Sequence, residues 1–405
     1  MTDQTRNPAL GLIALIVFID MAGIGLILPV MPGLVVTLAS VSTDRAAEIG
    51  GWLLFAYAVM QFLFAPVIGG LSDRYGRRPV LLWTLAALGV DYLLMAWAPT
   101  LVWLFVGRMI SGVMGATWAA ANSCVADCVA PHKRGAAFGV LGGAGASGFV
   151  LGPMIGGGFG MLGERVPFLA AALLCLAGVV YGWFRLRETL PADKRRSFDW
   201  RRANPFGSIV QMANSPLVIG CLAAIFFMQL AAQSQLSVWG YYGILKFGWT
   251  PFTIGWTVAL FGILLALAQG VLAGKAMAHF GAVRTARISL LFGIPSYLIL
   301  AFAGSTTDMV LGILVGSLGA LTFPAMQSLM TLEVAEDGQG ELQGAIASMI
   351  SLTSVIGPPI MAGLFGHFAD GAGYYFPGAP FILAAALLSV GAAILAATLR
   401  RFGRS

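Results

Sequence analysis

Apolar stretches of 20 or more residues recur along the whole chain, separated by short groups of Pro, Gly and charged residues. An α-helix rises about 1.5 Å per residue, so about 20 residues cross the ~30 Å hydrocarbon core of a bilayer. Of the 405 residues, 59% are apolar and 10% are charged, against roughly 25% charged in a soluble domain. A water-soluble fold cannot bury so much apolar surface, and the sequence predicts an all-α membrane protein.

The apolar runs predict twelve transmembrane helices in two groups of six. The first six cover residues 9–37, 47–71, 79–98, 101–128, 134–160 and 166–186. The last six cover residues 216–245, 251–279, 284–303, 307–334, 341–368 and 379–399. Residues 187–214 form the most polar segment of the chain and are predicted to be a solvated cytoplasmic linker. We therefore expect one six-helix bundle over residues 1–186 and a second over residues 215–405.

The positions of the basic residues predict the topology. If the N-terminus is cytoplasmic, 19 of the 23 Lys and Arg residues fall on the cytoplasmic side, as the positive-inside rule requires. Both termini are therefore predicted to face the cytoplasm of a bacterial inner membrane. The net charge of +6 then reflects topology, and no nucleic-acid partner is expected. The start of the chain lacks the pattern of a cleaved signal peptide.

The sequence gives no sign of an enzyme or of a metal site. Three histidines lie apart at the ends of predicted helices, and no Ser-His-Asp or metal-ligand spacing occurs; they are His132, His279 and His367. The four cysteines lie inside predicted helices and are interpreted as small packing residues; they are Cys124, Cys128, Cys175 and Cys221. We expect no resident cofactor.

The two halves of the chain repeat one another. Gly152 and Pro153 recur as Gly357 and Pro358, an offset of 205 residues. The same offset relates four further pairs of glycines, Gly69 and Gly274, Gly76 and Gly281, Gly135 and Gly340, and Gly139 and Gly344. Two similar six-helix bundles suit transport by alternating access, because they can rock about a site at mid-depth. The repeat favours a transporter without identifying its substrate.

The segment GGLSDRYGRRP, from Gly69 to Pro79, lies between predicted helices two and three. It resembles the signature loop of the major facilitator superfamily. The resemblance implies a contact of Asp73 with the start of helix eleven near Gly340 and Glu341, and an arginine that joins Asp127 to the cluster. The alternative is simple anchoring by positive charge, and the second half has Ala278 at the position of Asp73. The predicted cytoplasmic gate comprises Asp73, Arg74, Gly76, Arg77, Arg78 and Asp127.

Predicted helix five contains GASGFVLGPMIGG, with a glycine every four residues from Gly148 to Gly160. Such a stripe permits close approach of a neighbouring helix. The segment resembles the antiporter motif of the same superfamily, which implies export rather than uptake. Generic helix packing is the alternative. The residues assigned to the motif are Gly148, Gly152, Pro153, Gly156 and Gly157.

Three charged residues lie deep inside predicted helices one, three and four, namely Asp20, Asp91 and Arg108. An ionisable side chain at such a depth costs at least ~2.5 kcal/mol and usually serves function. Helix counting places all three ~16–20 Å from the cytoplasmic side. A carboxylate beside Arg108 can alternate between pairing with the arginine and holding a proton. We predict that these residues couple transport to protons; the alternative is a static buried pair.

The first half also resembles the tetracycline/proton antiporter subfamily, through FIDMAGIGLILPVMP, YAVMQFLFAP, LGVDYLLMA and GRMISGVMGAT. The resemblance implies that Asp20, Gln61, Asp91 and Arg108 occupy substrate and proton-path positions. It also implies a tetracycline, chelated to a divalent cation, that is exchanged for a proton. The second half departs from the pattern, with Leu265 in place of a histidine and a residue near Ile294 in place of an aspartate.

The expected function is a proton-coupled antiporter that exports tetracycline-like or other amphipathic drugs. Proton-linked uptake of a small metabolite is the alternative. The expected partners are the drug, protons and the lipid bilayer, the energy source is the proton gradient, and the expected state is a monomer. The additional candidates for substrate contact are Trp118, Asn122, Gln233, Trp239 and Gln327.

Overall fold

The computed structural model describes residues 8–115, 117–130, 133–195, 215–335, 338–371 and 373–402. Within these ranges the regular structure is entirely helical. Eleven helical segments there are long and apolar enough to cross a membrane. The twelfth predicted span, residues 101–128, is present as two shorter helices on either side of residue 116, which lies outside the described ranges. The all-α fold with twelve predicted spans is confirmed.

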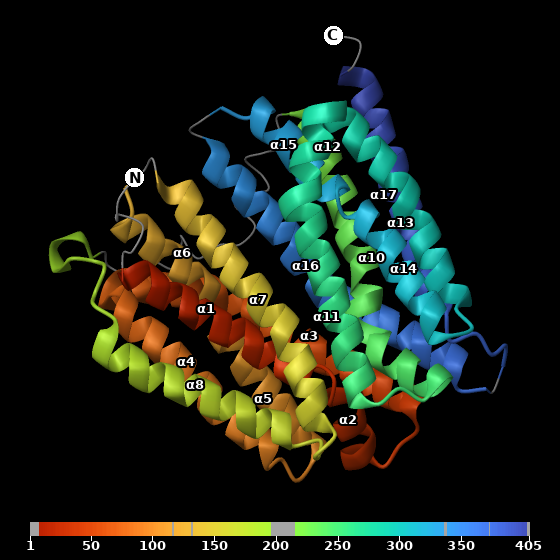
Figure 1. The fold of residues 1–405 in the computed structure, drawn as a ribbon, viewed down its shortest axis with the longest axis horizontal. Helices are drawn as coiled ribbons and strands as arrows, with labels where there is room; N and C mark the ends of the chain where they lie inside the picture. The colour runs from red at the N-terminus through yellow and green to blue at the C-terminus, as the bar shows by residue number, and fades with distance from the viewer. Residues whose placement is uncertain are drawn as a thin grey trace. The chain divides into compact units, whose positions relative to one another are not determined.

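The helices of the first half follow the predicted order (Figure 1). They are α1 (Pro8–Ile27), α2 (Met31–Ala39), α3 (Thr43–Tyr75), α4 (Arg77–Ala96), α5 (Leu101–Met114), α6 (Thr117–Cys128), α7 (Arg134–Gly160) and α8 (Val166–Arg185). A short 3₁₀ turn, Ala192–Lys194, follows α8. It lies in the predicted linker, of which residues 196–214 are outside the described ranges.

The predicted single helix over residues 9–37 is wrong. The chain leaves the helix at Ile27, forms a turn over residues 28–30 and enters α2 at Met31. Proline explains the break, because Pro29 has no amide hydrogen to donate within a helix, whereas Pro32 fits the first turn of α2.

The second half contains α10 (Pro216–Phe247), α11 (Pro251–Leu267), α12 (Ala273–Phe280), α13 (Ala282–Phe302), α14 (Thr306–Gly319), α15 (Thr322–Glu333), α16 (Gln339–Ala369) and α17 (Ala379–Phe402). Two predicted helices are interrupted here. A π-helical turn, Ala268–Leu272, joins α11 to α12. The predicted helix over residues 307–334 breaks at Ala320 and Leu321, and Pro324 lies in the first turn of α15, where no amide donor is required.

The contacts between backbones divide the chain into two compact units. The first unit comprises Met1–Ser40, Ala56–Asn204 and Thr250–Ala259, and the second comprises Val41–Phe55, Pro205–Trp249 and Leu260–Ser405. The units therefore follow the two sequence halves except near residues 41–55 and 250–259. As a result, α3 and α11 each contribute residues to both units.

The internal repeat is visible in the packing within each unit. In the first unit α1 packs on α7 and α4 on α8, and in the second α10 packs on α16 and α13 on α17 (Figure 1). The turn glycines also match: Gly76 has φ 106° and ψ 158°, and Gly281 has φ 77° and ψ 159°. Both precede a helix, α4 and α13, in a backbone conformation that favours glycine.

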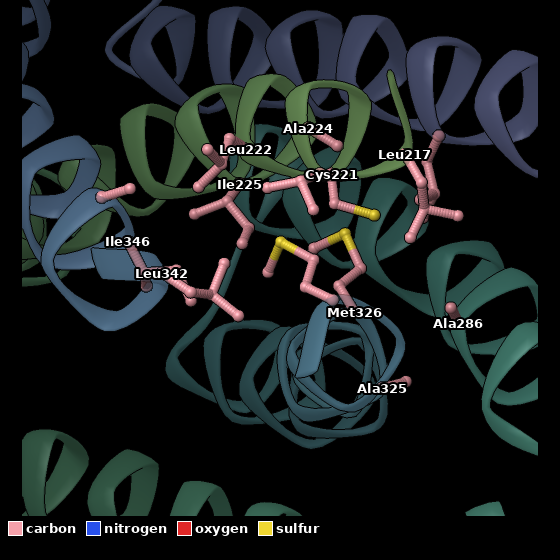
Figure 2. Close-up of a cluster of buried hydrophobic side chains, with 14 of the residues drawn as sticks. Leu217, Cys221, Leu222, Ala224, Ile225, Ala286, Ala325, Met326, Leu342 and Ile346 are labelled. Atoms are coloured by element: carbon pink, nitrogen blue, oxygen red, sulfur yellow. The ribbon is translucent and has the colours of Figure 1, made fainter. Parts of the chain in front are cut away.

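A buried apolar cluster in the second unit joins five helices, α10, α13, α15, α16 and α17 (Figure 2). Figure 2 shows Cys221 and Ile225 of α10 directed toward Met326 of α15, with Leu342 and Ile346 of α16 beside them. Burial of each such side chain contributes on the order of 1.5–3 kcal/mol when the alternative is water. The thiol of Cys221 is free and buried, as the packing interpretation requires.

Candidate functional site

The buried acidic and basic residues of the described chain all lie in the first half of the sequence. They are Asp20, Asp44, Arg77, Asp91 and Arg108. Asp44 lies in the first turn of α3 and Arg77 begins α4, whereas the other three lie in the middle of helices. Asp20 on α1 is 2% exposed, Asp91 on α4 is 1% exposed and Arg108 on α5 is 6% exposed. The predicted coupling residues are thus fully enclosed.

One face of α5 packs against Asp91. The hydroxyl of Ser111 donates a hydrogen bond to Oδ2 of Asp91. One turn earlier on the same face, a Cβ added to Gly107 would lie 3.0 Å from Oδ1 of Asp91. The absence of a side chain at Gly107 therefore leaves room for the carboxylate between α4 and α5.

The adjacent face of α5 packs against α3. The guanidinium carbon of Arg108 lies 4.6 Å from the centroid of the Tyr57 ring. Nε2 of Gln61 donates to the Tyr57 hydroxyl at 3.1 Å and to the carbonyl oxygen of Gly115 at 3.2 Å. A Cβ on Gly112 would lie 2.8 Å from Cβ of Met60, so glycine here permits the close approach of the two helices.

Arg108 makes no ion pair within 4.0 Å in the part of the chain that the structure describes. Oδ1 of Asp20, Oδ1 of Asp91 and Nε of Arg108 are buried without a hydrogen-bond partner. The charges of Asp20 and Arg108 both act on Tyr57, and the charge of Arg108 also acts on Asp91. The structure thus brings the three predicted coupling residues into the same buried region. The Arg108 guanidinium lies against the Tyr57 ring, and each carboxylate has one oxygen without a hydrogen-bond partner.

The glycine stripe of α7 lies against the backbone of α1. A Cβ on Gly148 would lie 2.5 Å from the carbonyl oxygen of Phe18, and a Cβ on Gly152 would lie 2.7 Å from that of Ala22. A Cβ on Gly156 would lie 2.7 Å from Cα of Leu26. Successive glycines therefore meet successive turns of α1, and the contact fixes the position of the helix that carries Asp20.

The remaining residues of the proposed antiporter motif lie in the same stretch of α7. Pro153 lies beside Gly25 of α1, and Gly157 faces the first turn of α11, which belongs to the first unit. A Cβ on Gly157 would lie 2.6 Å from the carbonyl oxygen of Pro251. The motif therefore packs α7 against two neighbours at once.

The loop between α3 and α4 forms a charge cluster. Arg77 lies 2.5 Å from Oδ1 of Asp73 and 2.9 Å from Oδ2 of Asp127 on α6, and it also donates to the hydroxyl of Ser72. Arg78 donates to the carbonyl oxygen of Trp183 at 2.7 Å. The structure thus places Arg77 between the two predicted carboxylates. The expected contact of Asp73 with the segment at residues 340–341 would join the two units and stays a prediction.

Arg74 contacts an exposed aromatic ring, whereas Arg77 and Arg78 contact carboxylates and a backbone carbonyl. Its guanidinium carbon lies 5.1 Å from the centroid of the exposed Tyr75 ring. Gly76 supplies the positive φ angle that turns the chain from α3 into α4.

The sequence matches the family model of the Major Facilitator Superfamily twice, over residues 13–243 and 230–403. The chain belongs to the major facilitator superfamily. The first matched range covers the predicted spans of the first half and most of the span over residues 216–245, and the second contains the last five spans.

Curated relatives from this superfamily cover most of the chain. The tetracycline resistance protein, class C, of Escherichia coli is 38% identical over 365 residues, which cover 90% of this chain and 91% of that protein. The class H protein of Pasteurella multocida is 34% identical and covers 89% of this chain and 90% of its own length. The hippocampus abundant transcript 1 protein of Mus musculus is 28% identical and covers 76% of this chain and 64% of its own length.

Solved structures of major facilitator proteins share the fold. A bacterial homologue of the human lysosomal transporter Spinster has a TM-score of 0.80 at 17% identity, and the match covers 99% of this chain and 98% of that chain. The human organic anion transporter MFSD10 has a TM-score of 0.71 at 23% identity, with 97% and 100% covered.

In this major facilitator protein the substrate candidates are divided between the two units. In the first unit, Trp118 and Asn122 lie one turn apart on α6, and the Trp118 ring packs on Gly145 of α7. Gln61 lies beside Tyr57, as described above. The structure therefore brings Gln61 to the coupling residues, whereas it shows Trp118 in a packing contact between α6 and α7.

The candidates of the second unit make neutral contacts. Nε2 of Gln233 on α10 donates to the hydroxyl of Ser354 on α16 at 3.2 Å, and its Oε1 is buried without a hydrogen-bond partner. Gln327 on α15 donates to Gln343 on α16 at 3.1 Å. Trp239 packs against Trp249 with 5.6 Å between ring centroids.

Leu265 on α11 and Ile294 on α13 are half-buried apolar side chains of the second unit. The buried polar residues of the described second half are all uncharged. The charged residues that this major facilitator chain buries within its helices are therefore confined to the first half, as the sequence predicts.

Sequence reasoning missed three residues of this major facilitator site. Tyr57 lies one turn from Gln61 on α3, and Ser111 lies one turn from Arg108 on α5, so helical spacing from a predicted residue would have found both. Glu188, which the sequence places in the linker, accepts hydrogen bonds from the backbone amides of Arg77 at 2.9 Å and Arg78 at 3.3 Å. It satisfies free amides at the start of α4, a contact over about 110 residues that no local pattern indicates.

Proposed function

We propose that this protein is a proton-driven antiporter that exports tetracycline-like or other amphipathic drugs. The observation that carries the proposal is the similarity, over about nine-tenths of the chain, to proteins named for tetracycline resistance. The buried carboxylates of Asp20 and Asp91, each with one oxygen that has no hydrogen-bond partner, supply a chemistry that fits it. These relatives favour export over the uptake of a metabolite.

In the proposed cycle, Asp20 and Asp91 take up protons from one side of the membrane and release them to the other. A buried carboxylate without a cation partner favours its neutral, protonated form, and a nearby cation favours the ionised form. Movement of the Arg108 charge relative to Asp91 therefore provides a means to bind and release a proton. The glycine stripe of α7 transmits the change to α1, because the two backbones are in contact.

The remaining features of the proposal follow from the topology and the relatives. The protein acts in a bacterial inner membrane with both termini in the cytoplasm, because the basic residues gather on that side. It works as a monomer, with the proton gradient as its energy source. A tetracycline would arrive chelated to a divalent cation. Leu265 and Ile294 are uncharged, and the buried polar residues of the described second half are uncharged as well, so the proposal extends to uncharged amphipathic drugs.

Transport in inverted membrane vesicles tests the function directly. The vesicles expose the cytoplasmic face, so an acidic lumen should drive tetracycline inward, and collapse of the pH gradient should release it. Vesicles from cells without the protein are the control. In parallel, a bacterium that lacks its own pumps should gain resistance when it expresses the chain. Absence of gradient-driven accumulation for tetracyclines and for a panel of unrelated amphipathic drugs would contradict the proposal.

A further inference from the structure

None of the sequence motifs described above predicts the contact between Arg108 and Tyr57. The guanidinium carbon lies 4.6 Å from the ring centroid, well within the distance at which a cation is attracted to the face of an aromatic ring. Such attraction is strongest where water is excluded, and Arg108 is 6% exposed. The ring is therefore the group in contact with this charge in the described structure, where no carboxylate lies within ion-pair distance of Arg108.

The Tyr57 ring is held from two sides. Its hydroxyl accepts a hydrogen bond from Gln61, which lies on the same face of α3 and also donates to the carbonyl oxygen of Gly115, the residue that follows α5. Its backbone lies against Gly112, also on α5, where a Cβ would lie 3.1 Å from the Tyr57 carbonyl carbon. The packing of α3 on α5 thus determines where the ring face lies.

The groups that face this contact come from five helices. Asp20 on α1 and Arg108 on α5 act electrostatically on Tyr57 of α3, and Asp91 on α4 lies near Arg108. The same interior contains the side chains of Tyr92 on α4 and Cys175 on α8. Tyr57 is the member whose ring contacts the cation.

We propose that Tyr57 is a positioning residue for proton coupling, whose ring holds the Arg108 side chain away from Asp20 and Asp91 while these carboxylates bind protons. The inference rests on the proposed function for its biological meaning. When a carboxylate releases its proton, the Arg108 side chain moves from the Tyr57 ring to that carboxylate. The ring and the carboxylate thus bind the same cation alternately. Without the ring, Arg108 pairs with a carboxylate permanently, and protonation then requires a more acidic medium.

Infrared spectroscopy of the purified full-length protein, without any drug, tests the role of the ring. The stretching band of a protonated carboxyl group is followed through a pH titration and is assigned with Asp20→Asn and Asp91→Asn. In Tyr57→Leu the band should appear only at a proton concentration about tenfold higher than in the wild type. Tyr57→Phe keeps the ring face and should titrate with the wild type. Tyr181→Leu, at an exposed tyrosine of α8, is the control.

Three results would overturn the proposal. The first is a titration of Tyr57→Leu that coincides with the wild type. The second is an equal displacement in Tyr57→Phe, since the hydroxyl would then be the active group. The third is a displacement by Tyr57→Leu in an Arg108→Gln background that is as large as its displacement in the wild type, because the ring must act through the arginine. Tyr57→Met, whose unbranched side chain fills irregular space, replaces Tyr57→Leu if the latter fails to fold. Since no drug is present, failure of drug transport contradicts the proposed function and leaves this test intact.

Discussion

Ser111, which lies one helical turn from Arg108 on α5, donates a hydrogen bond to Oδ2 of Asp91 on α4. The hydroxyl orients the carboxylate and leaves its other oxygen, Oδ1, without a partner. Hydrogen bonds to a charged acceptor contribute about 1.5–3 kcal/mol. The hydrogen bond from Ser111 fixes the orientation of the Asp91 carboxylate, and Oδ1 remains available for a proton. Substitution of Asp91 therefore tests its role.

Asp91→Asn should lower transport driven by a pH gradient on the order of 100-fold or more, a typical loss when a proton-transfer group is removed. An asparagine oxygen still accepts the hydrogen bond of Ser111, so the protein should fold, but the amide cannot carry a proton. Drug accumulation in inverted vesicles measures the effect. Asp193→Asn, at an exposed acidic residue of the turn after α8, is the matched control. Unchanged coupling in Asp91→Asn would refute the assignment of Asp91.

Gly156→Ala should lower the thermal stability of the purified protein, at a cost of about 1–3 kcal/mol for forced overpacking. The added methyl group would meet the backbone of α1 at Leu26. Two residues further, a methyl group on Gly158 would meet nothing within 4 Å, and Gly158→Ala should leave stability unchanged or raise it, because alanine favours a helix. Thermal unfolding of both variants in the same detergent provides the measurement. Equal stability of the two would show that α7 does not press on α1 as described.

Arg77→Ala should weaken the cytoplasmic cluster by roughly 1 kcal/mol for each ion pair lost, since Asp73 and Asp127 are partly exposed and solvent screens them. It would also leave the side chain of Ser72, which is fully buried, without this donor. Arg74→Ala removes an arginine stacked on an exposed ring and should have little effect. Thermal unfolding and drug accumulation distinguish the two variants. If Arg74→Ala is as harmful as Arg77→Ala, the loop acts through net charge and not through the observed ion pairs.

Much of the architecture can be predicted from local sequence patterns. The twelve spans follow from the length of apolar runs, and the repeat follows from the 205-residue offset, which the matching backbone angles of Gly76 and Gly281 reflect. Helix continuity was predicted less well. The apolar run over residues 9–37 continues through Pro29, and hydropathy does not register the missing amide that breaks the helix there.

The site shows the same division. The sequence alone singled out Asp20, Asp91 and Arg108 as candidates, because a charged residue inside an apolar helix stands out whatever surrounds it. Only the tertiary structure decided their partners. It placed Arg108 on Tyr57, Ser111 on Asp91 and Glu188 on the start of α4. These contacts join segments between 20 and 111 residues apart in the chain. They depend on the rotation and spacing of packed helices, which the glycines at positions 107, 112, 148 and 156 allow to approach closely.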